Sequence, residues 1–269
     1  MIAVDYHLHT RLCGHAAGEI QEYLERAAQK GLKEVGFSDH LPLYFLPPER
    51  AIPAYAMEEE ELPVYIDMVN NCRGVSPVKV KLGIEADYAP GYETRLASLL
   101  NEYSFDYVIG SVHFIDGWGF DNPDEIEEYS RRDINQVYEQ YFTLVQQAAL
   151  TGLFDIMAHP DLVKKFNFRP GRDLTPLYEE TAGVFKKAGV CVEVNTAGLR
   201  YPVKEIYPSP EMLGIFFKHG LPVTLGSDAH RPELVGADME KALLLLKDIG
   251  YKEIAVFERR QRKYLKIFN

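Results

Sequence analysis

The chain has 269 residues, of which 46% are hydrophobic and 26% charged, a composition typical of a globular protein with a large core. Its formal net charge of -11 argues against a general surface for nucleic acid or membrane, and its apolar runs are too short to span a bilayer. Its first residues, MIAVD, lack the basic segment and apolar core of a signal peptide.

The cysteines and the lack of internal linkers bear on compartment and domain number. Cys13, Cys72 and Cys191 are odd in number and far apart, so they predict neither a disulfide framework nor a thiolate zinc site. We therefore expect a reducing, cytoplasmic compartment. No Gly/Ser linker, low-complexity tract or repeat divides the chain, so we expect a single domain over residues 1–269.

Strand-like runs alternate with amphipathic segments along the chain. The expected strands are residues 2–8, 34–38, 78–85, 106–112, 154–158, 190–195 and 222–227. The expected helices are residues 19–30, 58–72, 135–150, 175–188 and 238–248. This alternation predicts βαβ units and a parallel sheet. An eighth strand-like run, 253–257, either closes a barrel or lies outside it. The long insertion 41–77 contains EEEE at 58–61, which is typical of a helix N-terminus.

Seven of the eight histidines lie at or just beyond the C-terminal end of an expected strand. That edge is where parallel α/β proteins build their active sites. Strand alternation places His7 and His9 on one face together with Asp5. The third strand is less regular, because Lys79 and Lys81 would share a face with Glu85. Only His219 falls at the end of an expected helix, where a structural role is predicted.

A single histidine at a strand end is usually structural, but this cluster is different. Burying so many titratable groups at one edge is costly unless cations organise them. Imidazole and carboxylate groups suit zinc, iron or manganese. The sequence therefore predicts a multinuclear metal site to which DYHLHTRLCGH, residues 5–15, contributes three ligands.

The motifs DYHLHT, FSDH, LGIEADY, GSVHF, AHPD and GSDAH occur in this order between Asp5 and His230. Together they resemble the PHP (polymerase and histidinol phosphatase) family of metal-dependent phosphoesterases. HPDLVKKF and EVNTAGLRYPVKEIYPS are similar to segments of the monofunctional histidinol-phosphate phosphatases of histidine biosynthesis. The resemblance implies an α/β fold, a distorted seven-stranded β/α barrel.

The resemblance also implies a trinuclear site holding two to three divalent transition metals (zinc, iron or manganese). The implied ligands of the first metal are His7, His9, Glu85 and Asp228; of the second, Glu85 as a bridge with His113 and His159; of the third, His15, His40 and His230. Every ligand of the pattern is present, which argues against a metal-free member of the family.

In the implied reaction a metal-bridging hydroxide attacks phosphorus and the histidinol alkoxide leaves. Glu85 and Asp228 are the expected catalytic carboxylates, and Asp161 or Asp228 would assist the leaving group. Asp5 and Asp39 are expected to orient ligand imidazoles. The candidates for binding the substrate phosphate are Arg200, Lys165 and Arg169.

Three other functional classes are alternatives to a histidinol-phosphate phosphatase. An amidohydrolase would leave His15 and His40 without a role. A PHP phosphodiesterase acting on small nucleotides or other phosphoesters is the main alternative, while the negative charge weakens a role on DNA. A non-catalytic metal-binding module would need neither a complete ligand set nor a phosphate-binding arginine. The expected partner is thus a small phosphate ester, with no nucleic acid or membrane. Helix 238–248 could also pack on a second copy, although core packing explains its leucines equally well.

Overall fold

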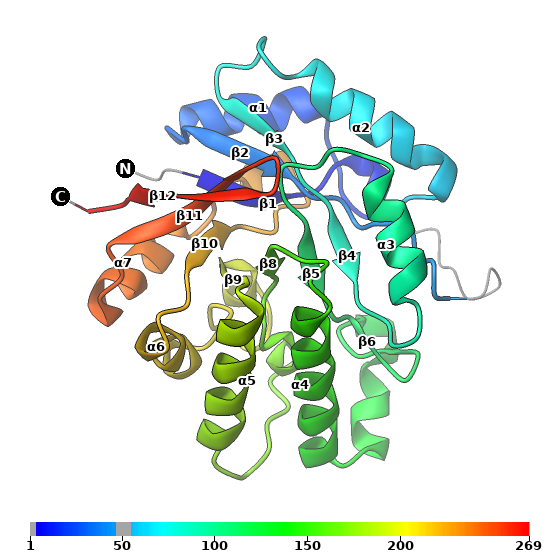
Figure 1. Cartoon of the computed structure of the whole chain (residues 1–269), viewed down its shortest axis with the longest axis vertical. Helices are drawn as coiled ribbons and strands as arrows, with labels where there is room; N and C mark the ends of the chain where they lie inside the picture. Colours follow the sequence, from blue (N-terminus) through cyan, green and yellow to red (C-terminus); the bar gives the residue numbers. More distant parts are fainter. Residues whose placement is uncertain (1–3, 47–54, 269) are drawn as a thin grey trace.

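The computed structural model describes residues 4–46 and 55–268, and its centre consists of parallel strands in two sheets (Figure 1). The first sheet has the order β1 (Val4–Leu8), β2 (Glu34–Phe37), β3 (Lys79–Leu82). The second has the order β10 (Val223–Gly226), β9 (Cys191–Asn195), β8 (Ile156–Met157), β5 (Ile109–Ser111), β4 (Glu85–Asp87). Every pair of neighbouring strands in these two sheets is parallel, which confirms the expected βαβ alternation.

The two sheets are joined by hydrogen bonds where β1 meets the segment after β10. The amide of His9 donates to the carbonyl of Ala229 over 3.0 Å, and the amide of Ala229 donates to the carbonyl of His7 over 3.1 Å. On the other side, the segment after β2 bridges to β4, where the amide of Leu41 donates to the carbonyl of Glu85 over 2.7 Å. The ends of β1, β2, β4 and β10 therefore meet at one place.

The expected strand 78–85 is divided into β3 and β4 by Gly83 and Ile84. A Cβ atom on Gly83 would lie 2.4 Å from the ring of Tyr107, so only glycine leaves room for this ring. Because the strand is interrupted, Lys79 on β3 and Glu85 on β4 do not follow one alternation. The Lys79 side chain lies outside the predicted site. Its Nζ atom pairs with Glu34 over 3.0 Å.

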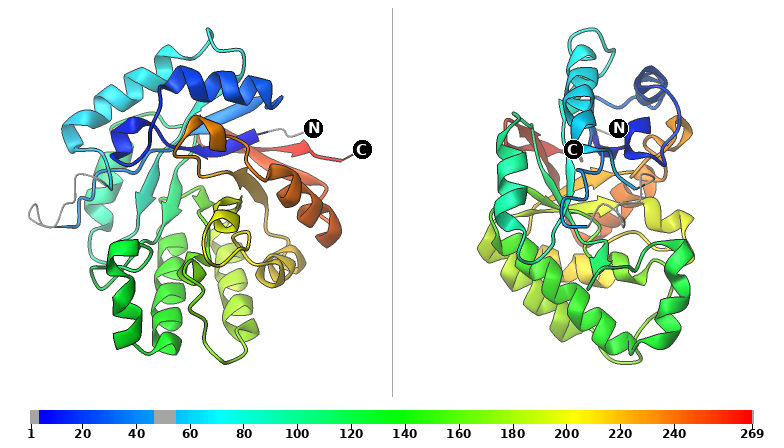
Figure 2. Two further views of the ribbon diagram at one scale, coloured as in Figure 1. Left: turned by 180° about the vertical axis from the view of Figure 1, so that it is seen from behind. Right: turned by 90° about the vertical axis from the view of Figure 1, so that its right-hand side faces the viewer.

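Helices cover the outside of the strands (Figure 2). They are α1 (Ile20–Gln29), α2 (Leu62–Asn71), α3 (Glu93–Asn101), α4 (Ile134–Leu150), α5 (Thr175–Ala188), α6 (Pro210–Lys218) and α7 (Met239–Ile249). Short 3₁₀ segments lie at Arg11–Cys13, Glu59–Glu61, Pro123–Arg131, Leu162–Lys164, Ala197–Arg200 and Pro232–Leu234. The five expected helices are confirmed, and the acidic run 58–61 does precede a helix. Helix α6 is the helix expected to end at His219, and Ser209 and Pro210 form its start signal. Helix α3 was not predicted.

The eighth strand-like run lies outside the parallel sheets. β11 (Glu253–Glu258) pairs antiparallel with β12 (Gln261–Lys266), and a second small hairpin joins β6 (Phe114–Ile115) to β7 (Trp118–Gly119). The ring of Phe257 packs on Tyr6 and Tyr107, with centroids 6.3 and 6.1 Å away. The amide of Arg260 donates to the carbonyl of Asp106 over 2.8 Å, just before β5. The β11–β12 hairpin therefore packs at the N-terminal ends of strands, opposite the predicted site. In the part of the chain described, no helix has the length and apolar character needed to cross a membrane.

Candidate metal centre

The histidines and acids at the strand ends meet at one cavity of about 700 Å³. The predicted ligands that line this cavity are His15, His40, Glu85, His113, His159, Asp228 and His230. His7 and His9, on and just after β1, lie fully buried in contact with this group. The structure thus brings together all nine residues predicted as ligands, and it leaves His219 outside, where its Nε2 atom pairs with Glu179 over 2.6 Å.

Glu85, the first residue of β4, lies at the centre of the cluster and is 1% exposed. Its Oε2 atom is 3.1 Å from His7 Nε2 and 3.0 Å from His40 Nδ1. Its Oε1 atom is 3.1 Å from His159 Nε2 and 3.8 Å from His113 Nε2. The two oxygens therefore face different sets of imidazoles, which is the arrangement required of a bridging carboxylate. Burial alone would raise the pKa of Glu85, but His40 and His7 hold this pKa well below its usual range.

The donor atoms form groups of the size that a metal ion needs. Within each group the ligand atoms lie within 4.8 Å of one another. Three of these groups are His7, His9 and Glu85; Glu85, His113 and His159; and His15, His40 and His230. Asp228 lies between the first and third groups, since its Oδ1 atom is 3.5 Å from His9 Nε2 and 3.3 Å from His230 Nδ1.

The chemistry of these donors fits metal ions. Both ring nitrogens of His9, Nδ1 of His159 and Nε2 of His230 are buried and have no hydrogen-bond partner among the residues described. Such orphaned polar atoms are unfavourable unless another group binds them. Burial also lowers the pKa of His40 and of His230 well below the usual value. Neutral imidazole is the form that binds a metal ion, so these two side chains are available as ligands.

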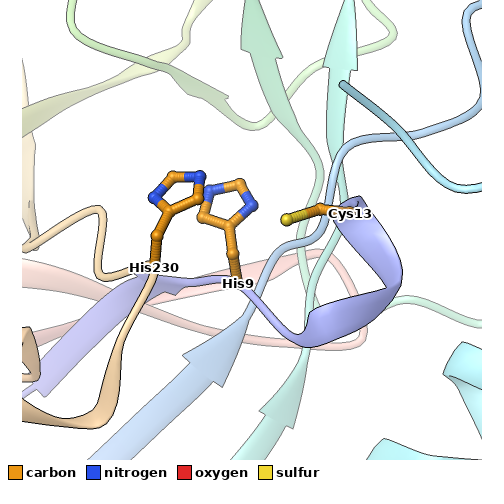
Figure 3. Close-up of side chains that lie close together, drawn as sticks. All are labelled: His9, Cys13 and His230. Carbon is orange, nitrogen blue, oxygen red and sulfur yellow. The ribbon is translucent and has the colours of Figure 1, made fainter. Parts of the chain in front are cut away.

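Cys13, which the sequence did not assign to the site, borders the third group. Figure 3 shows its sulfur directed toward the rings of His9 and His230, which stack with centroids 4.1 Å apart. Their ligand atoms and Cys13 Sγ also lie within 4.8 Å of one another. Burial, together with the nearby Asp39 carboxylate, raises the pKa of the Cys13 thiol.

Two carboxylates that the sequence reading missed hold ligand imidazoles. Glu193 Oε1 lies 2.6 Å from His7 Nδ1, and its Oε2 accepts the amide of His159 over 3.0 Å. Asp87 Oδ1 lies 3.0 Å from His113 Nδ1. Burial lowers the pKa of His7, but Glu193 and Glu85 raise it well above the usual value. The signal for Glu193 was present, because one acid in the apolar run VCVEVN must find a partner when buried.

The prediction that Asp5 and Asp39 orient imidazoles is wrong. Asp5 accepts hydrogen bonds from the amide and hydroxyl of Ser227, at 2.8 and 2.5 Å, and from the amide of Gly236 at 2.9 Å. Asp39 accepts from the amide and hydroxyl of Thr10, at 2.6 and 2.5 Å. The pairing of β1 with β2 shifts register between Asp5 and Leu8, so simple alternation does not hold there. Both acids instead anchor the loops that follow β10 and β1.

The phosphate-binding candidates divide into two sets. Arg200 and Lys165 line the cavity, where Arg200 Nη2 donates to the carbonyl of Ser227 over 2.6 Å and Lys165 Nζ pairs with Asp121 over 2.9 Å. The Nη1 atom of Arg200 is buried and without a partner among the described residues. Arg169 does not line the cavity, and its guanidinium donates to Glu205 over 3.0 Å.

Asp161, the other expected assistant of the leaving group, is also not brought to the cavity. It is 1% exposed, accepts the amide of Ser209 over 2.7 Å and pairs with Lys164 over 2.7 Å. These contacts hold the carboxylate among segments that follow β8 and β9. Of the two carboxylates proposed for this role, the structure leaves only Asp228 on the cavity wall.

Comparison with known proteins identifies the family. The model of the PHP domain matches residues 5–197, which include most of the ligand cluster. The chain belongs to the PHP family.

Curated relatives of this PHP protein extend over almost the whole chain. It is 40% identical to the "Probable histidinol-phosphatase" of Deinococcus radiodurans over 96% of this chain and 98% of that protein. It is 26% identical to the "Histidinol-phosphatase" of Bacillus subtilis, over 89% of this chain and 97% of the relative. A "Probable phosphatase" of Thermoanaerobacter pseudethanolicus is 27% identical over 98% of this chain and 95% of that protein.

The fold of this PHP protein also matches a solved structure. Histidinol phosphate phosphatase from Lactococcus lactis, solved in complex with zinc, L-histidinol and phosphate, superposes with a TM-score of 0.83. The match covers 97% of this chain and 98% of that one at 21% identity. At 21% identity, this structural similarity establishes the fold alone.

We predict that Glu193→Gln weakens metal binding in the PHP site. Glutamine keeps the shape of the side chain but removes the charge that fixes His7, and loss of such a partner typically lowers metal affinity about 10- to 100-fold. Competition with a chromophoric chelator would measure the affinity. Glu205→Gln is the matched control, because Glu205 pairs with Lys164 and Arg169 and does not line the cavity. An affinity equal to that of the control would contradict the positioning role of Glu193.

Proposed function

We propose that the chain hydrolyses L-histidinol phosphate to L-histidinol and inorganic phosphate. The observation that carries this proposal is the position of Glu85, which joins two groups of imidazoles beside a cavity that also contains Arg200 and Lys165. The curated histidinol-phosphatases that match the chain over nearly its whole length support the same substrate.

We infer that the cluster binds two to three divalent transition metals. His7, His9, Glu85 and Asp228 would hold the first, Glu85, His113 and His159 the second, and His15, His40 and His230 the third. When bound, such ions neutralise phosphoryl charge and activate water at neutral pH. Zinc is supported by the solved Lactococcus lactis complex, and iron or manganese would suit the same ligands.

The side chains of the protein would position the ester. Arg200 is half-buried and held by the carbonyl of Ser227, so its Nη1 atom, which has no partner among the described residues, can donate to a phosphoryl oxygen. The Lys165 ammonium is steadied by Asp121 and by the ring of Tyr201, whose centroid is 4.5 Å from Nζ. Asp228 would act as a carboxylate, since burial raises its pKa but His7, His9 and His230 hold this pKa well below the usual range.

The charge at the cavity favours a substrate that also carries a positive group. Asp121 is neutralised by Lys165, but Asp124 and Glu125 add further negative charge to the cavity wall. The ammonium group of histidinol phosphate would be attracted there, whereas the second phosphate of a nucleotide would be repelled. The alternative, a PHP phosphoesterase acting on small nucleotides or other phosphoesters, is supported by the relative named only as a phosphatase.

We also infer that the two parallel sheets form one distorted seven-stranded barrel, with β3 and β4 as halves of one strand. The hydrogen bonds between the β1 and β10 sides support closure. A single buried core, reaching from Val4 to Phe257, supports one domain. Three buried cysteines, each unpaired, support a reducing, cytoplasmic location.

The substrate proposal is tested by comparing kcat/KM for L-histidinol phosphate, p-nitrophenyl phosphate and bis(p-nitrophenyl) phosphate. We expect kcat/KM to be much higher for L-histidinol phosphate than for p-nitrophenyl phosphate. We expect bis(p-nitrophenyl) phosphate not to be hydrolysed. Equal efficiency on the two monoesters would leave only a general phosphatase. Preference for the diester would favour the phosphodiesterase alternative.

We predict that Arg200→Ala lowers kcat/KM for L-histidinol phosphate about 10- to 100-fold, the usual cost of a lost hydrogen bond to a charged group. Steady-state kinetics check this value. An unchanged melting temperature would show that the loss comes from phosphate binding and not from the lost hydrogen bond to the Ser227 carbonyl. Arg169→Ala is the matched control, because its guanidinium lies outside the cavity. Equal kinetics for the two variants would rule out phosphate binding by Arg200.

A further inference from the structure

Tyr207 lines the cavity and has a hydroxyl group to which no role has been assigned. The residue is fully buried, lines the cavity, and its hydroxyl oxygen has no hydrogen-bond partner among the described residues. A buried hydroxyl without a partner is unfavourable, so its presence calls for a group that binds there.

The backbone and ring of Tyr207 are held firmly. Its amide donates to the carbonyl of Asn195 over 2.9 Å, and the amide of Asn195 donates back over 2.7 Å. The ring lies against Gly198, where a Cβ atom would be 2.9 Å from the tyrosine Cζ atom. Its centroid is 6.3 Å from that of His159, and Lys164 Nζ is 5.4 Å from the ring. The hydroxyl is therefore a preorganised group beside the ligand cluster.

We propose that the Tyr207 hydroxyl donates a hydrogen bond to a non-bridging phosphoryl oxygen of the bound monoester. This inference rests on the proposed phosphatase function and adds a substrate-binding residue to it. A phenol hydroxyl is a hydrogen-bond donor as well as an acceptor. It can therefore donate to an anion. The anion would satisfy the orphaned hydroxyl, and the hydroxyl would bind a charge that water no longer solvates.

The test is Tyr207→Phe, which removes only the oxygen. We expect the Kd of inorganic phosphate, measured by calorimetry on the metal-loaded protein, to rise about 10- to 100-fold. The KM for L-histidinol phosphate and for p-nitrophenyl phosphate should rise by a similar factor. Because the oxygen has no partner among residues 4–46 and 55–268, the melting temperature without phosphate should be unchanged or higher.

Tyr251→Phe is the matched control. The Tyr251 hydroxyl is likewise buried and without a partner in the described chain, but it does not line the cavity. Its removal should leave the Kd of phosphate and both KM values unchanged.

Four results would overturn the proposal. If the wild type binds phosphate and hydrolyses monoesters, an unchanged Kd of phosphate in Tyr207→Phe would show that Tyr207 does not bind phosphate. The proposed phosphatase function would then stand without it. A lower metal content in Tyr207→Phe would show that Tyr207 acts through the metal ligands. A rise in KM for L-histidinol phosphate but not for p-nitrophenyl phosphate would place the contact at the leaving oxygen. A wild type that neither binds phosphate nor hydrolyses any monoester would overturn the proposed function as well.

Discussion

Glu85→Gln is expected to lower kcat by at least about 10³-fold, because loss of a direct, shared ligand should exceed the 10- to 100-fold effect typical of an outer-shell partner. Glu85 Oε2 faces His7 and His40 while Oε1 faces His159, so one substitution disturbs two groups of ligands. Glutamine has nearly the same shape as glutamate, so the packing around it should survive. Steady-state kinetics at saturating substrate would measure the loss, and circular dichroism would check the fold.

Glu179→Gln is the matched control for that substitution. The Glu179 carboxylate is exposed and pairs with His219 over 2.6 Å, away from the cavity. Exposed ion pairs contribute little to stability, so the control should remain folded. Because Glu179 is away from the cavity, the kinetics should equal those of the wild type. If Glu85→Gln and Glu179→Gln had similar kcat values, Glu85 would not bridge metal ions in the active protein.

Removal of metal ions is expected to abolish hydrolysis. The purified active protein should contain two to three equivalents of zinc, iron or manganese, measured by elemental analysis. Treatment with a chelator should reduce activity to background, and addition of zinc or manganese should restore it. The melting temperature should fall on removal, because ions that bind only the folded state add about 4 kcal/mol of stability at 1,000 times their Kd.

The ligand variant His9→Ala and the surface variant His219→Ala separate specific from general effects of metal removal. His9 is fully buried, and neither of its ring nitrogens makes a hydrogen bond to the described residues, whereas His219 lies outside the cavity. Only His9→Ala should lose metal and activity. Full activity with less than one equivalent of metal would contradict the metal-centre proposal.

Local patterns in the sequence predicted much of the secondary structure. The apolar runs 190–195 and 222–227 became the parallel neighbours β9 and β10, because buried strands carry near-continuous hydrophobic residues. Helix α3 was missed, since its nine residues are fewer than the window over which a helical period can be recognised. The third strand was predicted as continuous, whereas the structure divides it at Gly83 and Ile84, where the ring of Tyr107 leaves no room for a Cβ atom on residue 83.

The sequence by itself determined the types of ligand and their place at the strand ends. Histidine, glutamate and aspartate followed successive strands, and the carboxyl ends of parallel strands share one edge, so convergence of His7, Glu85, His113 and His159 could be expected. The tertiary structure decided which side chains support them. Asp5 and Asp39 are close to ligands in sequence yet bind loop amides, whereas Glu193, far away in sequence, binds His7. Arg169 and Lys165 are four positions apart, but only Lys165 reaches the cavity. The physical reason is that strand order and periodicity specify an edge of a sheet, while the direction of a side chain at that edge depends on bulges, loops and packing partners distant in the sequence.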